Sequence, residues 1–205
     1  GAARAHVRKQ RDRQVQEIFI ISNVKENGEP IGALGSETVD FHSDLSYLSH
    51  PGTISLLQAL EIPLQGGQTQ FCDCRAAYDA LDPDRRQYLS TLRAVHRHHV
   101  EEQNPPGIVS HPLVRTHPET RRKSLYVSPH LTSHIDGFAA QQSDQLLLEL
   151  YQHMDQTAFV WTHEWRVGDL LMWDNRPTMH RRLGFPDQQR RVMKRTQVFG
   201  DEPVE

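Results

Sequence analysis

The chain has few cysteines: only two of its 205 residues are Cys. They are Cys72 and Cys74, which lie too close along one predicted strand to form an ordinary disulfide bond. We therefore expect reduced thiols in a cytoplasmic protein. A Cys-x-Cys metal site is the alternative, but the sequence has no second cysteine pair to complete it.

The chain also lacks a strong charge of either sign and any long apolar run. Its formal net charge is −3, which gives no field that calls for nucleic acid, and the basic opening "RAHVRKQRDR" is expected to be a solvated surface segment. No apolar stretch approaches the roughly 20 residues that a membrane-spanning helix needs, and no signal peptide is visible. With 37% hydrophobic and 24% charged residues, the composition is typical of a globular protein.

The sequence contains no repeats, low-complexity tract or domain linker, so we expect a single domain over residues 1–205. The chain begins "GAARAH", without an initiator methionine. We expect it to be a segment from inside a longer protein that lacks some N-terminal elements.

Short apolar runs separated by turn residues predict a mainly β protein with inserted helices. Asp82 as N-cap with Pro83 after it predicts one helix, and Ser143 is the expected N-cap of a second, whose leucines form a core stripe. The last third alternates or is continuously apolar, which favours a sandwich or barrel. The clearest predicted strands are 17–24, 52–63 and 69–73.

The stretch "VDFHSDLSY" places His42 and Asp44 two positions apart, so that in an extended segment both point the same way. His-x-Asp/Glu occurs five times in the chain, so only the context can select one pair. This pair precedes a long apolar strand, and a third candidate ligand, His180, follows "GDLLMWDN" far downstream. Further on, Arg191 and Arg195 share one face of a predicted strand, where a buried arginine requires an anion. The hypothesis is a two-histidine, one-carboxylate metal site beside an anion-binding arginine.

Five segments together resemble the TauD/TfdA family of taurine dioxygenase and its relatives: "FHSDLSY", "ALEIPLQGGQTQFCDCRAAYDAL", "HPLVRTHPETRRKSLYVS", "VGDLLMWDNRPTMHR" and "RRVMKRT". The resemblance covers nearly the whole chain and implies a double-stranded β-helix, or jelly roll, with helical insertions. It implies that His42, Asp44 and His180 hold Fe(II). One departure is Phe41, where the family usually has Trp before its first histidine ligand.

The resemblance also implies roles for four further residues. Thr69 and Arg191 match the groups that bind the distal carboxylate of the cosubstrate 2-oxoglutarate, and Arg195 matches a position that helps bind an anionic substrate. Tyr47 matches an aromatic position near the substrate, with simple core packing as the alternative. Trp165 and Trp173 are expected in the core, Asp174 and Asn175 in a turn, and His111, His117 and His130 at the surface or in turns.

The implied activity is Fe(II)- and 2-oxoglutarate-dependent oxidation by O2 of a C–H bond in a small, anionic organic substrate, by hydroxylation or C–heteroatom cleavage, with release of succinate and CO2. Expected partners are a small-molecule substrate and further copies of the chain in a dimer or tetramer, but not nucleic acid or a membrane. Two alternatives stay open: a catalytically silent jelly-roll binding protein, and a zinc-dependent hydrolase that uses the same three ligands.

Overall fold

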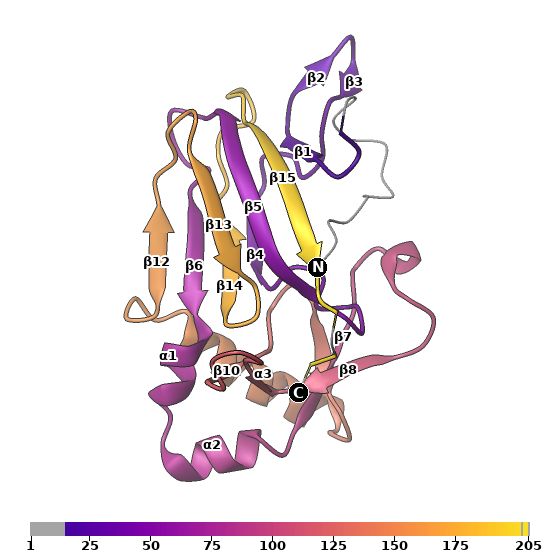
Figure 1. The fold of residues 1–205 in the computed structure, drawn as a ribbon, viewed down its shortest axis with the longest axis vertical. Helices are drawn as coiled ribbons and strands as arrows, with labels where there is room; N and C mark the ends of the chain where they lie inside the picture. The colour runs from indigo at the N-terminus through magenta and orange to yellow at the C-terminus, as the bar shows by residue number, and fades with distance from the viewer. Residues whose placement is uncertain (1–14, 202, 205) are drawn as a thin grey trace.

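The computed structural model describes residues 15–201, 203 and 204, and its centre is a pair of four-stranded antiparallel sheets (Figure 1). The first sheet has the order β1 (Phe19–Ser22), β15 (Val192–Phe199), β5 (Gly52–Glu61) and β13 (Leu170–Asp174). The second has the order β12 (Val160–His163), β6 (Thr69–Asp73), β14 (Thr178–Arg182) and β4 (Val39–His42). From β4 to β6, and again from β12 to β15, the chain passes back and forth between the two sheets, which confirms the predicted jelly roll.

Apolar side chains from both sheets fill the space between them, because strand alternation turns every second residue inward. Phe71 of β6 packs edge-on against Trp173 of β13, with the ring centroids 5.3 Å apart. Trp165 and Met193 belong to the same buried cluster. The two tryptophans are therefore core residues, as the sequence predicts.

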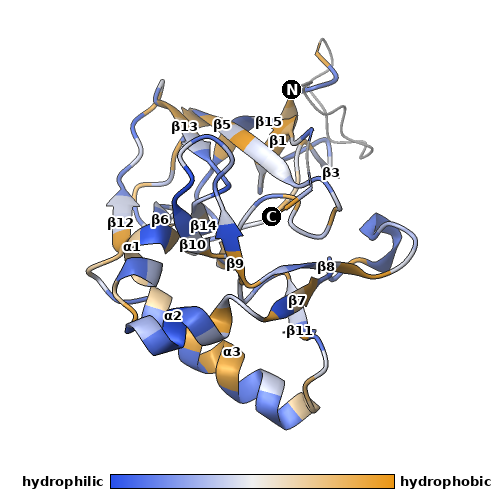
Figure 2. Cartoon of the chain, turned by 60° about the horizontal axis from the view of Figure 1, so that its bottom comes forward, coloured by the Kyte–Doolittle hydropathy of each residue, from blue (hydrophilic) through white to orange (hydrophobic). Residues whose placement is uncertain are grey.

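The helices and two of the three smaller sheets form a second layer below the jelly roll in Figure 1, whereas the sheet of β2 and β3 lies at the top of that view. The helices are α1 (Cys74–Asp79), α2 (Pro83–Leu89) and α3 (Ala140–Met154), with a 3-10 turn at Glu101–Gln103. The smaller sheets contain β7 (Arg93–His96), β8 (Val109–Pro112) and β11 (Thr132–Ile135), then β9 (Val114–Thr116) and β10 (Lys123–Leu125), and finally β2 (Lys25–Glu26) and β3 (Glu29–Pro30). Leucines on one side of α3 pack into a core shared with α1 and α2 (Figure 2).

Two local predictions need correction. Helix α3 begins at Ala140 with Ala139 at the N-cap position, and Ser143 lies inside the helix, where its hydroxyl accepts a hydrogen bond from the Ile135 backbone N–H at 2.9 Å. Cys72 and Cys74 are free and buried, as expected, but Cys74 is the first residue of α1 and does not lie on the strand. Asp82 does cap α2, because its carboxylate accepts a hydrogen bond from the Arg85 N–H at 2.8 Å.

Among the described residues, no helix is long and apolar enough to cross a membrane.

Candidate functional site

Two imidazoles and one carboxylate from distant parts of the chain converge beside the paired strands β4 and β14. His42 ends β4, Asp44 lies two residues further on, and His180 on β14 is the register partner of His42. The Nε2 atom of His42 is 3.7 Å from Oδ1 of Asp44, and Nε2 of His180 is 3.8 Å from Oδ2. Within the described residues, this is the one group of three ligand-type side chains whose ligand atoms all lie within 4.8 Å of one another.

Burial and neighbouring charges together set the charge state of these three side chains. Burial, followed by the neighbouring His180, lowers the pKa of His42 to about 4, and burial also lowers the pKa of His180. Burial alone would raise the pKa of Asp44, but Arg195 and the two imidazoles outweigh it and hold that pKa well below its usual range. At neutral pH the site therefore presents two neutral imidazoles and one carboxylate.

Hydrogen bonds fix how His42 and Asp44 face the centre of the site, whereas Nδ1 of His180 is buried without a hydrogen-bond partner among the described residues. The Nδ1 atom of His42 lies 2.8 Å from the Asp40 carbonyl oxygen, a bond that places the proton on Nδ1 and leaves the Nε2 lone pair facing Asp44. The Ser55 hydroxyl donates to Oδ2 of Asp44 at 2.6 Å, and the Asn175 amide donates to that hydroxyl at 2.7 Å. The sequence assigned Asn175 to a turn and did not identify Ser55. The only available signal was a serine on the inward face of an apolar strand.

Arg191 lies just before β15, with 2% of its surface exposed. Burial, together with the neighbouring Arg182, lowers the pKa of its guanidinium to about 9. Its buried Nε has no hydrogen-bond partner, and its guanidinium has no acidic partner among the described residues. By contrast, Arg190 is exposed and pairs with Glu61 at 2.6 Å, so adjacent arginines on the two faces have opposite environments.

Thr69 starts β6 and is buried, and its hydroxyl accepts a hydrogen bond from the Trp165 indole N–H at 3.0 Å. The turn before Thr69 needs glycine at position 67, because neighbouring atoms leave no room for a side chain there. A Cβ on Gly67, which has a φ of +73°, would lie 2.8 Å from Pro63 and 3.4 Å from the Arg191 side chain. The turn thus lets the backbone before Thr69 approach the buried guanidinium.

Arg195 and Tyr47 lie in different surroundings. The Nη1 atom of Arg195 is 3.4 Å from Oδ1 of Asp44, and its buried Nε has no partner among the described residues. Tyr47 is buried in a small cluster with Leu45 and Leu131, and its ring meets His98 edge-on at 5.0 Å. Arg195 therefore adjoins the three-residue cluster directly, whereas the contacts of Tyr47 are those of a packed side chain.

Two histidines predicted at the surface or in turns are buried. His111 donates from Nε2 to the Ser46 carbonyl at 2.9 Å, and Nε2 of His117 lies 3.1 Å from Asp174. The prediction was wrong for His111, which lies on β8, whereas His117 does begin a turn, as predicted, and only its expected exposure was wrong. The chain segments that cover both rings are remote in sequence. The ring of His130 lies 5.3 Å from the ring of His42, beside the candidate site.

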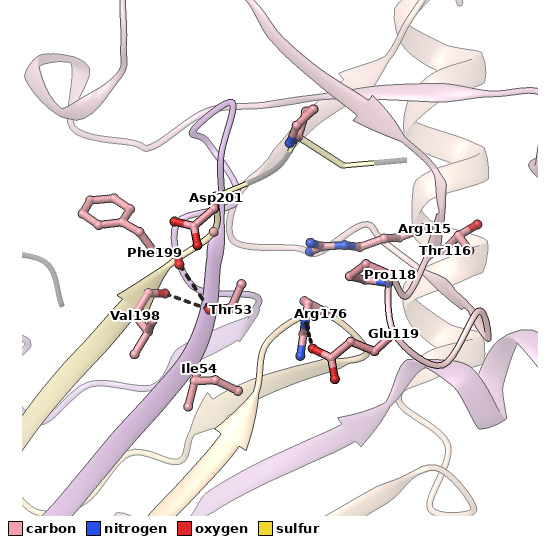
Figure 3. Close-up of a pocket in the computed structure, with 12 residues that line it drawn as sticks. Thr53, Ile54, Arg115, Thr116, Pro118, Glu119, Arg176, Val198, Phe199 and Asp201 are labelled. Carbon is pink, nitrogen blue, oxygen red and sulfur yellow. Dashed lines mark hydrogen bonds and ion pairs between the residues drawn. The ribbon is translucent and has the colours of Figure 1, made fainter. Parts of the chain in front are cut away.

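A separate cavity of about 420 Å³ lies where the start of β5 meets the end of β15 (Figure 3). Thr53, Phe199 and Asp201 line one side, and Arg115, Glu119 and Arg176 line the other. None of the three converging residues lines it, so it does not mark their site.

Comparison with known proteins gives a consistent family assignment. The profile of the family described as "Taurine catabolism dioxygenase TauD, TfdA family" matches residues 1–197. The 2,4-dichlorophenoxyacetate dioxygenase of Burkholderia sp. (strain RASC), described as alpha-ketoglutarate-dependent, is 38% identical over 90% of this chain and 68% of its own length. The (S)-phenoxypropionate/alpha-ketoglutarate-dioxygenase of Sphingobium herbicidovorans is 30% identical over 92% of this chain and 75% of its own length.

Two solved structures agree with the sequence comparisons. A taurine dioxygenase from Burkholderia xenovorans superposes with a TM-score of 0.80 at 30% identity, and the match covers 97% of this chain and 67% of that chain. AAD-2, solved with Mn(II) and N-oxalylglycine, matches with a TM-score of 0.74 at 40% identity over 80% of this chain and 64% of that chain. The chain therefore belongs to the TauD/TfdA family of 2-oxoglutarate-dependent dioxygenases, enzymes that use Fe(II), 2-oxoglutarate and O2.

Proposed function

We propose that this chain oxidises a C–H bond of a small anionic organic substrate, with His42, Asp44 and His180 as the Fe(II) ligands. The observation that carries the proposal is the convergence of two neutral imidazoles and one carboxylate within 4.8 Å. Such a facial set leaves coordination positions open, as non-heme iron oxygenases require. Fe(II) with O2 and 2-oxoglutarate supplies the oxidising chemistry, in which the cosubstrate becomes succinate and CO2 while oxygen enters the substrate.

The buried arginine supports the cosubstrate part of the proposal. A buried guanidinium without an acidic partner is costly, and a carboxylate matches its planar fork. Within the part of the chain that the structure describes, Arg191 is such a group, and the tight turn at Gly67 brings the chain leading to Thr69 beside it. We assign Arg191 and the Thr69 hydroxyl to the distal carboxylate of 2-oxoglutarate. A zinc-dependent hydrolase does not use 2-oxoglutarate, so it would not need Arg191 and Thr69 to bind a carboxylate.

The substrate class follows from Arg195 and from the relatives. The Arg195 side chain is mostly buried and lies on β15, four residues after Arg191. Its guanidinium has a 3.4 Å contact with Asp44 and lies 5.4 Å from the Phe19 ring, and its buried Nε has no hydrogen-bond partner among the described residues, so it can still bind an anion beside the metal ligands. The names of the relatives specify phenoxyacetate, phenoxypropionate and sulfonate substrates, all of them anions. We therefore propose a carboxylate or sulfonate substrate with its acidic group near Arg195. For Tyr47 a place at the wall of the substrate pocket rests on its matching family position alone, because its contacts with Leu45, Leu131 and His98 are those of a packed side chain.

The test is succinate formation with Fe(II), 2-oxoglutarate and a panel of aryloxyacetates, alkyl sulfonates and the matching uncharged alcohols. We expect an anionic compound to raise succinate formation, with equal amounts of succinate and oxidised product. His42→Ala should abolish the turnover, and Arg195→Gln should remove the preference for the anion over its alcohol. Substrate binding without O2 consumption would favour a silent binding protein, and O2-independent hydrolysis with Zn(II) would favour a hydrolase.

A further inference from the structure

Three side chains behind Asp44 form a line of hydrogen bonds that all run in one direction. The Trp173 indole N–H donates to Oδ1 of Asn175 at 3.0 Å, and Nδ2 of Asn175 donates to the Ser55 hydroxyl at 2.7 Å. The hydroxyl in turn donates to Oδ2 of Asp44 at 2.6 Å. The line joins β13, the residue after it and β5 to the carboxylate.

The direction of this line follows from the chemistry of its ends. An indole N–H can only donate and a carboxylate can only accept, so the oxygen of the Asn175 amide must face Trp173. The Asp44 backbone N–H, 3.3 Å from the same Oδ1, requires that orientation as well. Nδ2 then faces Ser55, and the hydroxyl has one remaining role, which is to donate its proton to Asp44.

Bulk solvent does not reach the members of the line. Ser55 and Asn175 are both 0% exposed, and Trp173 is buried between the two sheets. A donor removed from this region leaves its acceptor without a partner, because buried polar groups have no solvent to turn to. The orientation of the carboxylate is therefore set by these side chains.

The two oxygens of Asp44 have unequal surroundings as a result. Oδ2 accepts a short hydrogen bond of 2.6 Å from Ser55, and Nε2 of His180 lies 3.8 Å from it. Oδ1 accepts a longer hydrogen bond of 3.4 Å from Arg195 and lies 3.7 Å from Nε2 of His42. We propose that Trp173, Asn175 and Ser55 are positioning residues that hold Oδ2 back, so that Asp44 offers Oδ1 alone as a metal ligand. The inference rests on the proposed function, since it needs Asp44 to be a ligand. A carboxylate that uses one oxygen leaves a coordination position free, and the reaction needs that position.

The test compares the metal affinity and metal geometry of purified variants without any turnover. Ser55→Ala removes the last donor of the line, and Trp173→Phe removes the first while keeping an aromatic ring. Ser43→Ala is the matched control: Ser43 is also buried and lies between two ligands, but its hydroxyl donates to the Thr178 carbonyl at 3.0 Å. Mn(II) affinity is measured by calorimetry, and coordination geometry by the visible absorption spectrum with Co(II).

Loss of a hydrogen-bond partner behind a metal ligand weakens metal binding by about 10- to 100-fold. We expect a loss of that size in Ser55→Ala, a smaller loss in Trp173→Phe and none in Ser43→Ala. The Co(II) spectrum should change in Ser55→Ala, because Oδ2 becomes available as a second ligand atom, and a loss of fold stability alone would not change it.

The inference is overturned if Ser55→Ala and Trp173→Phe both bind Mn(II) like the original chain with an unchanged Co(II) spectrum. It is also overturned if Ser43→Ala weakens binding equally. If the unsubstituted chain binds neither Mn(II) nor Co(II), the proposed function itself fails, so the two failures are distinguishable.

Discussion

Replacing Arg191 with glutamine should separate cosubstrate binding from folding. The guanidinium is 2% exposed, and burial with the neighbouring Arg182 lowers its pKa to about 9, so at pH 7 it is a buried cation. Truncating one partner of a buried, hydrogen-bonded charge pair costs about 2–5 kcal/mol. At about 1.4 kcal/mol per factor of ten, Arg191→Gln should weaken 2-oxoglutarate binding by about 30- to 4,000-fold.

Arg191→Gln should not destabilise the protein when 2-oxoglutarate is absent. Without 2-oxoglutarate the Arg191 charge has no acidic partner among the described residues, so its removal should leave the unfolding temperature unchanged or raise it. Calorimetry gives the affinity of the Mn(II)-loaded protein for 2-oxoglutarate, and thermal unfolding with and without the cosubstrate gives its stabilising effect. That effect should be present in the unsubstituted chain and nearly absent in Arg191→Gln.

Arg190→Gln is the matched control, because the neighbouring arginine is exposed and pairs with Glu61. It should leave 2-oxoglutarate affinity unchanged, and both variants should keep their affinity for Mn(II). The reasoning is refuted if Arg191→Gln binds 2-oxoglutarate normally, or if Arg190→Gln weakens it to the same extent.

Two further predictions concern Thr69 and the buried histidines. Thr69→Val keeps the shape but leaves the Trp165 indole N–H without its acceptor, so urea unfolding should show a loss of about 1–3 kcal/mol together with weaker 2-oxoglutarate binding; full stability in urea would contradict the assigned contact. Burial, followed by His111, lowers the pKa of His96 to about 3, so below pH 6.5 the unfolded chain takes up a proton that the folded chain does not. The free energy of unfolding should therefore fall by about 1.4 kcal/mol per pH unit for this group as the pH drops towards 3. Measured by urea unfolding at each pH, the free energy should depend less steeply on pH in His96→Gln than in the exposed control His134→Gln.

The strand pattern predicts a mainly β sandwich or barrel and makes His42, Asp44 and His180 candidates, and the resemblance to the TauD/TfdA family adds the jelly roll and the assignment of these three residues as ligands. Alternation and turn residues locate β5 and β6 to within about two residues, and the His42–Asp44 pair follows from its position before a long apolar strand. The Arg190 and Arg191 environments also follow from alternation, since adjacent residues face opposite ways.

What the sequence does not predict depends on contacts between remote segments. Ser143 has the chemistry of an N-cap, but its hydroxyl bonds to the Ile135 backbone, and the helix begins three residues earlier. His117 lies in a polar stretch that suggests exposure, yet it is buried against Asp174. Asn175 lies in the bend between β13 and β14, as predicted, but its bond to Ser55 could not be predicted because it forms only when β13 has paired with β5. The alternation of residues in the sequence predicts which face of a strand a side chain lies on, but it does not predict which remote residues that side chain contacts.

The most direct test of the central claim is an anomalous-difference map from crystals grown with Mn(II) and 2-oxoglutarate. The account predicts one Mn(II) peak within bonding distance of Nε2 of His42, Oδ1 of Asp44 and Nε2 of His180, with the distal carboxylate of 2-oxoglutarate at Arg191. A peak that lacks any of these three ligands, or a cosubstrate whose carboxylate lies away from Arg191, would contradict it.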